Sequence, residues 1–307
     1  MRNGLKCGIL LTLAGWFVLT MLLQGLLHAA PKPRNPILRV TLSKPNYLLS
    51  EPVFATISVV NTGKTPVKVR KLYLPFRDLK LIVANSAGKA YPLAYTSTLQ
   101  RDPSRSVTVG PGDSAYVVVD LLPLYAEGKP QARKLHTETF LPPGSYTVGA
   151  TFESGAGKRA SPPVSFTVSN PDEGERWNFE MLNKAAKFQQ AGKMDSAAGA
   201  LDSIIDHSPG SAYHVAAYLQ KMYLYERDRN KSEQEAACGA ALALVGTHPE
   251  SEACISALSY YMIHSDQIEK TRQDLRDTML GILKKFPDTR VAREAFKALK
   301  TLPALDE

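Results

Sequence analysis

The residues of this chain that could do chemistry are scattered and form no recognised catalytic motif. Six histidines occur among 307 residues, with no His-Glu-x-x-His, Gly-x-Ser-x-Gly, phosphate-loop or Cys-x-x-Cys pattern. His207, His214 and His248 lie in or beside two similar turns, where a zinc site is one interpretation and solvated turn histidines are the favoured one. We therefore predict no catalytic residue, no metal and no cofactor.

Two cysteines bracket one of those turns. Cys238 and Cys254 are centred on residue 246, so in an antiparallel helix hairpin they would face each other. A disulfide here would stabilise the fold by about 3 kcal/mol in an oxidising compartment. The alternative is two small buried thiols at a tight helix contact.

A group of aromatic and sulfur-containing side chains recurs at helical spacing between residues 213 and 261. One interpretation is a groove wall that holds an apolar peptide. The other, which we favour, is ordinary packing between helices. The residues are Tyr213, Tyr218, Met222, Tyr225, Tyr260 and Tyr261.

The elements that would position these residues are marked by a repeated turn. Pro209-Gly210-Ser211, Pro249-Glu250-Ser251 and Pro287-Asp288-Thr289 each end one helical stretch and begin another, and the prolines lie 40 and then 38 residues apart. Proline cannot continue a helix, and the Ser or Thr can cap the next one. This period predicts an array of helix pairs over residues 172–307.

The first pair is expected at residues 177–191 and 194–207, and it resembles a tetratricopeptide repeat. The resemblance rests on family-like residues at six positions, with Ala185 in place of the family's glycine: Phe188, Gly192, Ala197, Leu201, Ile204 and Pro209. It implies a solenoid whose first helices line a groove for peptides or partner helices. Further pairs are expected at 211–227 with 232–246 and 251–264 with 268–286, before a capping helix at 291–302.

Residues 36–169 show a different pattern. Apolar and polar residues alternate with period two, as at Leu38, Val40 and Leu42, and short runs are separated by turns such as Asn85-Ser86-Ala87-Gly88. This pattern predicts a sandwich of two β-sheets.

Three stretches carry a resemblance to bacterial immunoglobulin-like domains of exported proteins, and to the similar sandwich of proteinase inhibitors. They are residues 45–53, 59–63 and 143–148. In that pattern a tyrosine after Pro-Gly hydrogen-bonds back across a corner, and Tyr146 fits the role. The stretch has no Cys or Trp, so packing alone must hold the sheets together.

The net charge of +8 divides unevenly between these two parts. Residues 31–171 hold 18 Lys and Arg against 8 Asp and Glu, whereas residues 172–307 hold 17 against 21. The basic part could meet an acidic partner or an anionic envelope polymer, or it is simply a solvated surface. No run of five like charges occurs, so we expect no nucleic-acid partner. The basic segment 124–139 is a candidate contact loop.

Residues 1–30 have the form of an export signal. Arg2 and Lys6 precede an uncharged stretch, residues 7–30, that is long enough to span a bilayer. Cleavage of the signal and retention as an N-terminal membrane anchor stay open. We expect an extracytoplasmic protein, either periplasmic or secreted if the signal is cleaved, or anchored in the inner membrane if it is not.

Together these features predict a multidomain β plus α protein: a signal or anchor over 1–30, an immunoglobulin-like sandwich over 36–169 and tetratricopeptide-like helices over 172–307. The expected function is capture of a peptide or protein partner without catalysis. The alternatives are a secreted proteinase inhibitor that acts through the sandwich loops, and an accessory or envelope-polymer-binding protein that uses the basic sandwich.

Overall fold

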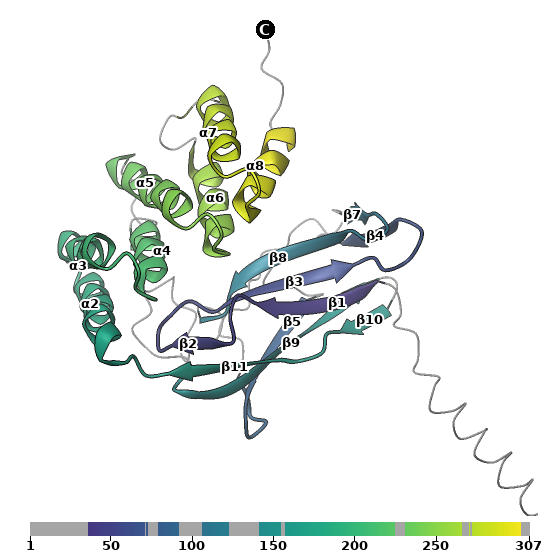
Figure 1. The fold of residues 1–307 in the computed structure, drawn as a ribbon, viewed down its shortest axis with the longest axis horizontal. Helices are drawn as coiled ribbons and strands as arrows, with labels where there is room; N and C mark the ends of the chain where they lie inside the picture. The colour runs from purple at the N-terminus through teal and green to yellow at the C-terminus, as the bar shows by residue number, and fades with distance from the viewer. Residues whose placement is uncertain are drawn as a thin grey trace, which may run out of the picture.

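The chain folds into strands followed by helices (Figure 1). The computed structural model describes residues 36–70, 72, 79–91, 106–122, 141–154, 157–224, 231–265, 270 and 272–301. The expected signal or anchor (1–30), the basic segment 124–139 and Tyr225 lie outside these residues. None of the helices in the described part is long and apolar enough to cross a membrane.

Within the described residues the strand-built part holds eleven strands. They are β1 (Ile37–Leu42), β2 (Asn46–Leu48), β3 (Phe54–Val60), β4 (Val67–Arg70), β5 (Leu79–Asn85), β6 (Ala90–Tyr91), β7 (Ser106–Val109), β8 (Ser114–Asp120), β9 (Gly144–Ser154), β10 (Gly157–Ala160) and β11 (Val164–Ser169). The short strands β2 and β10 were not expected.

These strands form two principal sheets around one core. The first has the order β1-β3-β8, and the second has the order β2-β11-β9-β5-β6 with β10 paired to β9. A separate pair, β4-β7, adds a small third sheet. All pairings are antiparallel except β2 with β11. Because alternate side chains point inward, residues such as Val40, Ile57, Leu81 and Val148 fill the space between the sheets.

The expected corner hydrogen bond of Tyr146 is present. Its hydroxyl donates to the Pro142 carbonyl at 2.5 Å, four residues upstream. The ring stacks on Phe166 with centroids 5.5 Å apart and meets Tyr91 edge-on. Tyr146 therefore fixes the start of β9 against its neighbours, as the sequence predicted.

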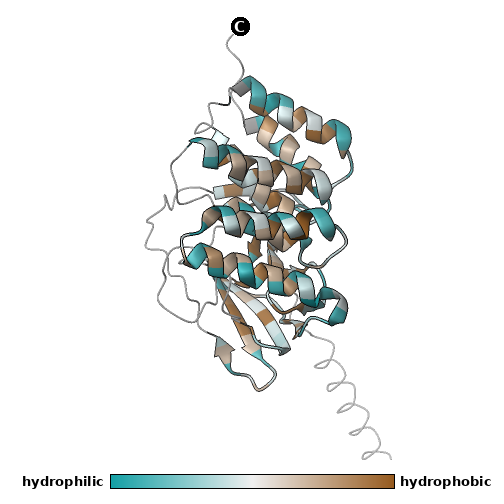
Figure 2. Cartoon of the chain, turned by 90° about the vertical axis from the view of Figure 1, so that its left-hand side faces the viewer, coloured by the Kyte–Doolittle hydropathy of each residue, from teal (hydrophilic) through white to brown (hydrophobic). Residues whose placement is uncertain are grey.

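The rest of the described chain consists of seven helices. They are α2 (Glu173–Gln190), α3 (Met194–His207), α4 (His214–Leu224), α5 (Lys231–Thr247), α6 (Ala253–His264), α7 (Arg272–Lys285) and α8 (Arg290–Thr301). The Asp172 carboxylate caps α2 by accepting from the Glu175 amide at 3.0 Å. Figure 2 shows the helices as a stack of near-parallel rods.

Successive helices pack side by side from α2 to α6, and α7 packs against α8. The expected third pair, α6 with α7, is more open: it is joined by the hydroxyls of Tyr261 and Thr278 at 3.4 Å, while its backbones make few close contacts. The first helices α4, α6 and α8 also touch one another in order, as in a stacked array.

The repeated turn has the same hydrogen bonds each time. The amides of Ser211, Ser251 and Thr289 donate to the carbonyls of Ser208, His248 and Phe286, at 3.0, 3.0 and 3.2 Å. The hydroxyl of each Ser or Thr then accepts from an amide two or three residues later, at 3.0, 3.2 and 3.2 Å. The proline period thus corresponds to three equivalent turns that cap α4, α6 and α8.

Candidate functional site between the strands and the helical turns

The three turns form a row, and the segment from β2 to β3 runs along it (Figure 1). At one end the Tyr213 hydroxyl, beside the first turn, donates to the Leu49 carbonyl at 2.8 Å. Next along, Pro52 and Phe54 lie opposite the first and second turns. The order of the strand residues therefore follows the order of the turns.

Ser50 shapes the start of the segment between β2 and β3 that runs along the turns. Its φ of 67° lies in the left-handed region that non-glycine residues seldom adopt. The resulting tight turn, closed by the Glu51 amide on the Leu48 carbonyl at 3.0 Å, leaves the Leu49 carbonyl available to Tyr213.

At the third turn, Arg290 contacts both the second turn and strand β3. Its Nη1 donates to the Glu252 carboxylate in the second turn at 2.6 Å and lies 3.4 Å from the Thr56 hydroxyl on β3. The ion pair is largely shielded from solvent, so it is screened less than a surface pair. Successive turns are thereby tied both to each other and to the strand.

We call the contact between the strands and the row of helical turns the junction. It ends at Tyr116 on β8, and α8 covers this residue. The Tyr116 hydroxyl donates to Glu294, and Lys297 donates to Glu294 at 2.8 Å. The Lys297 ammonium lies 4.5 Å from the centroid of the Tyr116 ring, and Arg290 lies at 5.7 Å. Burial and the neighbouring Glu294 carboxylate raise the pKa of Tyr116, so it stays a neutral phenol.

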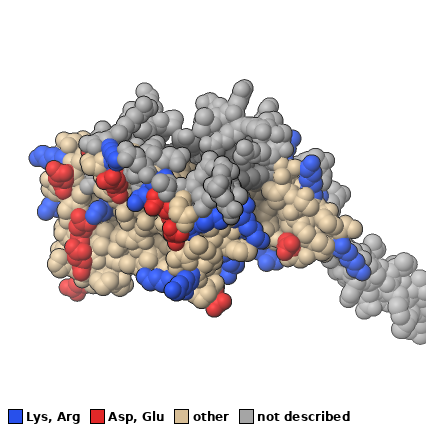
Figure 3. Space-filling view, turned by 90° about the horizontal axis from the view of Figure 1, so that it is seen from above, with Lys and Arg blue, Asp and Glu red and all other residues tan. Residues whose placement is uncertain are grey.

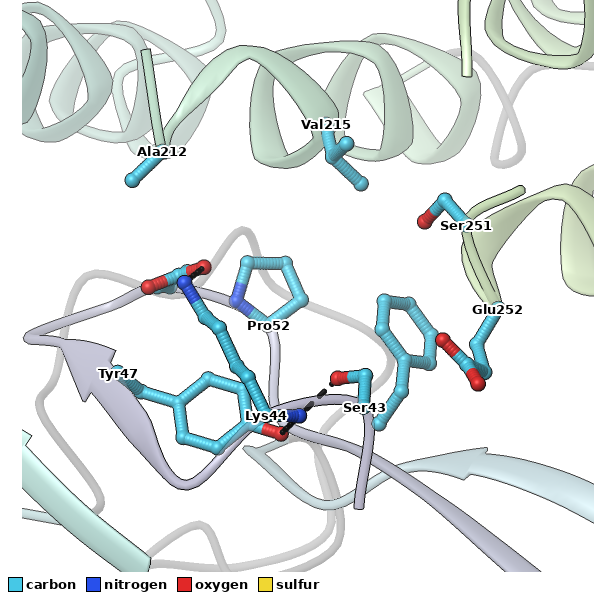
Figure 4. A pocket seen from close by; sticks show the side chains of 10 residues that line it. Ser43, Lys44, Tyr47, Pro52, Ala212, Val215, Ser251 and Glu252 are labelled. Carbon is cyan, nitrogen blue, oxygen red and sulfur yellow. Dashed lines mark hydrogen bonds and ion pairs between the residues drawn. The ribbon is translucent and has the colours of Figure 1, made fainter. Parts of the chain in front are cut away.

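Between the first two turns and the strands lies a pocket of about 230 Å³ (Figure 4). Val215 on α4 and Ala212 just before this helix point down toward the pocket, and Pro52 and Lys44, in the loops on either side of β2, face them. The lining is partly apolar and partly polar. It consists of Ser43, Lys44, Tyr47, Glu51, Pro52, Phe54, Ala212, Val215, Ser251 and Glu252.

The charged groups of the pocket are paired within the protein. Lys44 forms an ion pair with Glu51, whose second carboxylate oxygen accepts from the Leu48 amide at 2.9 Å. Burial nevertheless raises the pKa of Glu51 above its ordinary value, against the opposing effect of Lys44. Glu252 is paired with Arg290. The pocket therefore presents compensated charge and suits a mixed polar and apolar group.

The hydroxyls in the lining are engaged in structural hydrogen bonds. Ser43 Oγ and the Tyr47 hydroxyl lie 2.9 Å apart, and Ser251 Oγ accepts from the Ala253 amide at 3.2 Å. Burial raises the pKa of Tyr47. Among the described hydrogen bonds, neither serine is joined to a histidine that could act as its base.

The aromatic groove candidates lie inside the helical core. Exposed fractions are 0% for Tyr213 and Met222, 2% for Tyr261, 6% for Tyr260 and 8% for Tyr218. Side chains this buried offer almost no surface to a peptide. The structure thus favours the packing interpretation, because these residues fill the spaces between consecutive helices.

The two cysteines are free buried thiols. Burial raises the pKa of Cys238 to about 11 and that of Cys254 to about 12, so both stay protonated and unreactive at neutral pH. The Cys254 thiol donates to the His248 carbonyl and lies 3.6 Å from the Leu244 carbonyl. Of the two interpretations left open by the sequence, this structure has the thiols.

The three turn histidines separate into two groups. His214 and His248 meet, with Nδ1 of the first 2.6 Å from Nε2 of the second. His207 instead contacts its own helix, with Nδ1 3.0 Å from the Ser203 carbonyl. Among the described residues no cluster of three potential ligands could hold a metal ion.

Sequence reasoning missed the junction itself. Its main signal is β3, where the side chains of Phe54 and Thr56 point away from the sandwich core yet are only 5% and 7% exposed. The run from Val53 to Ile57, apolar except for Thr56, is buried on both faces, which indicates a strand covered on both sides. The sequence gives no hint that the cover is the row of helical turns.

Charge is distributed differently over the two parts. In the view of Figure 3, Asp and Glu lie mainly on the helical side, while Lys and Arg lie on both. In the strand-built part, exposed basic residues include Arg39, Lys68, Lys80, Lys89 and Lys158. The described strands therefore keep the basic character expected from the sequence.

Comparisons with known proteins give little guidance. No family model matches the chain, and no curated protein matches it. The β-glucosidase EmGH1 of Erythrobacter marinus is 14% identical over 43% of this chain and 15% of its own, with a TM-score of 0.22. The sporulation control protein Spo0M of Bacillus subtilis is 16% identical over 48% and 54%, with a TM-score of 0.24. The chain thus spans less than two thirds of either protein, and neither likeness carries an argument.

Proposed function

We propose that this chain is an exported, non-enzymatic recognition protein of a bacterial cell envelope, in which a protein or peptide partner engages the junction pocket. The observation that carries the proposal is that strands and helical turns build this pocket together, from Lys44, Pro52 and Phe54 on one side and Val215 and Ser251 on the other. Pockets between structural units are common ligand sites.

The size and lining of the pocket indicate what it holds. A volume of about 230 Å³ is below the usual range for drug-sized ligands and fits one or two side chains of a peptide. Pro52, Phe54 and Val215 offer apolar contact, while Lys44 and Glu252 supply polar groups at the rim. Affinity would come from this anchor together with the surrounding surface.

The fold supports the resemblances that motivate this function. A first strand that divides between two sheets, with β2 parallel to the last strand β11, agrees with an immunoglobulin-like arrangement, as does the Tyr146 corner. Three equivalent turns with stacked first helices agree with a tetratricopeptide-like array. We place the partner contact at the junction pocket and not in the groove that the resemblance implies. Export rests on the form of residues 1–30, with anchoring through residues 7–30 as one outcome.

A photocrosslinking residue placed at Lys44 of the full chain, in native envelopes, tests the proposal. We expect a dominant protein adduct from position 44 and none from Lys80, an exposed control on β5. The adduct should disappear when Val215→Trp fills the pocket. Equal labelling from both positions, or an adduct that survives Val215→Trp in a folded protein, would show that the partner binds elsewhere.

The basic surface of the strands favours a second candidate, binding of an anionic envelope polymer. Exposed Lys68, Lys80, Lys89 and Lys158 would supply the charge. Such binding should weaken steeply with salt because exposed charges are screened. Binding of a purified anionic wall polymer that is unchanged between low and high salt would exclude it.

A further inference from the structure

Two histidines from successive turns are in direct contact inside the helical stack. His214, at the start of α4, is 3% exposed, and its Nδ1 lies 2.6 Å from Nε2 of His248, which precedes the second proline turn. Their rings meet edge-on with centroids 4.9 Å apart. The contact joins the first turn to the second.

Hydrogen-bond chemistry fixes where the protons lie. Nε2 of His214 is 3.0 Å from the Ile205 carbonyl, which can only accept, so this nitrogen must carry a hydrogen. Nδ1 of His214 then accepts a hydrogen bond from Nε2 of His248. If both rings were protonated, Nδ1 of His214 and Nε2 of His248 would each carry a hydrogen and no acceptor would remain between them. The contact therefore tolerates at most one positive charge on the pair.

The surroundings do not stabilise that charge. In α4 the Tyr218 ring meets His214 edge-on at 5.1 Å, and in α6 the Cys254 thiol donates to the His248 carbonyl. On α3, Asp206 and His207 are exposed, and His207 contacts Ser203. Glu250 and Glu252 lie in the same turn, where they raise the pKa of Cys254, but burial first and His214 second lower the pKa of His248.

We propose that His214 and His248 form a pH-sensitive latch that holds the first two helical turns together when both rings are neutral and releases them on acidification. The residues beside the latch line the helical side of the junction pocket: Ala212 in the first turn, Val215 on α4, and Ser251 and Glu252 in the second turn. Opening the latch separates these two walls. The latch does not depend on what the pocket binds.

The direction of the effect follows from proton linkage. The unfolded chain has an ordinary histidine pKa near 6.5, and the folded chain holds His248 below that value. Between the two, the unfolded state binds more protons, so stability falls as pH falls. Each unit by which the pKa is lowered weakens the folding equilibrium up to about tenfold at acidic pH.

Urea unfolding of the full chain between pH 7.5 and 5, with an NMR titration of the histidine rings, tests the latch. His248→Gln keeps a donor but cannot titrate, so it should remove most of the acid-dependent loss of stability. His207→Gln, beside the first turn but outside the pair, should leave the loss unchanged. An unchanged pH slope in His248→Gln overturns the proposal. So does a His248 pKa at or above 6.5 in the wild-type spectrum, which decides the question even if the variant fails to fold.

Discussion

The strand-built part and the helical part fill their cores with different side chains. Between the sheets, large residues such as Ile57, Leu79, Tyr47 and Phe166 interdigitate. Among the described buried residues, fifteen alanines lie in the helical region, whereas only Ala55 and Ala150 lie on strands. Small residues let helix backbones approach closely, so contact comes from backbone and β-carbon rather than from long side chains. The helices should therefore suffer from added volume and the sheets from deleted volume.

The junction joins these two kinds of packing. Phe54 belongs to β3 but packs in the cluster of α4, α5 and α6, and Val118 on β8 packs against the same cluster. Each is a strand residue whose side chain is larger than the alanines of the helical core around it. The sequence predicts separate domains over 36–169 and 172–307, but these contacts cross between the two ranges.

The largest loss of stability is expected from a change at Phe54, which belongs to a strand but packs with the helices. Phe54→Ala removes a nearly buried ring from the helical core and leaves a cavity, which should destabilise the protein by about 3–5 kcal/mol. Because the ring joins both parts, urea unfolding should also lose its single transition. Ile82→Ala, at an exposed position of β5, should change stability by less than about 0.5 kcal/mol. A small loss with one transition would mean that the parts are not coupled through Phe54.

A smaller loss of stability is expected from added volume inside the helical core. Ala241 on α5 is fully buried, so Ala241→Leu should overpack the stack and cost about 1–3 kcal/mol in thermal or urea unfolding. Ala243 on the same helix is exposed, and Ala243→Leu should be nearly neutral. Equal tolerance at the two positions would contradict close alanine packing.

The smallest effect concerns pH. Burial raises the pKa of Asp120 to about 7, although its Oδ1 accepts from the amides of Leu122 at 3.1 Å and Val53 at 3.3 Å. The folded state then holds a proton that the unfolded chain loses above about pH 4. Stability contributed by this group is lost as pH rises from about 4 through 7, the opposite of His248.

Asp120→Asn tests that sign. The amide oxygen can keep both hydrogen bonds without titrating, so the decline in stability between pH 4 and 7 should become shallower. Urea midpoints across that range, with exposed Asp113→Asn as the control, measure the difference. A steeper decline in the variant would reverse the assignment.

The sequence predicts elements well where the signal is local. The helix Met194–His207 has the expected bounds because its apolar stripe and both turns lie within a few residues. The Tyr146 hydrogen bond was likewise foreseen from Pro143-Gly144. The strand β2 was missed since three residues carry no periodicity and its partner β11 lies about 120 residues away.

The site was harder to foresee because it depends on docking. Spacing correctly placed Tyr218 and Tyr261 on helices, whereas Tyr213 precedes α4, and all three side chains are buried. Conversely, Lys44 and Glu252 form one pocket from distant parts of the chain, and no local pattern joins them. The consecutive apolar residues Val53, Phe54 and Ala55 are a sequence signal that could have indicated a strand covered on both faces.

Hydrogen exchange of the full-length protein tests most directly whether strand and turns act as one recognition body. Peptides that cover residues 209–216, 249–256 and 287–294 report the three turns, and one that covers 52–60 reports β3. We predict that all three turns are as protected as β3 and that they lose protection together in Phe54→Ala. Rapid exchange at the turns in the wild-type protein, or a loss confined to one turn in the variant, would contradict a shared junction and the pocket built on it.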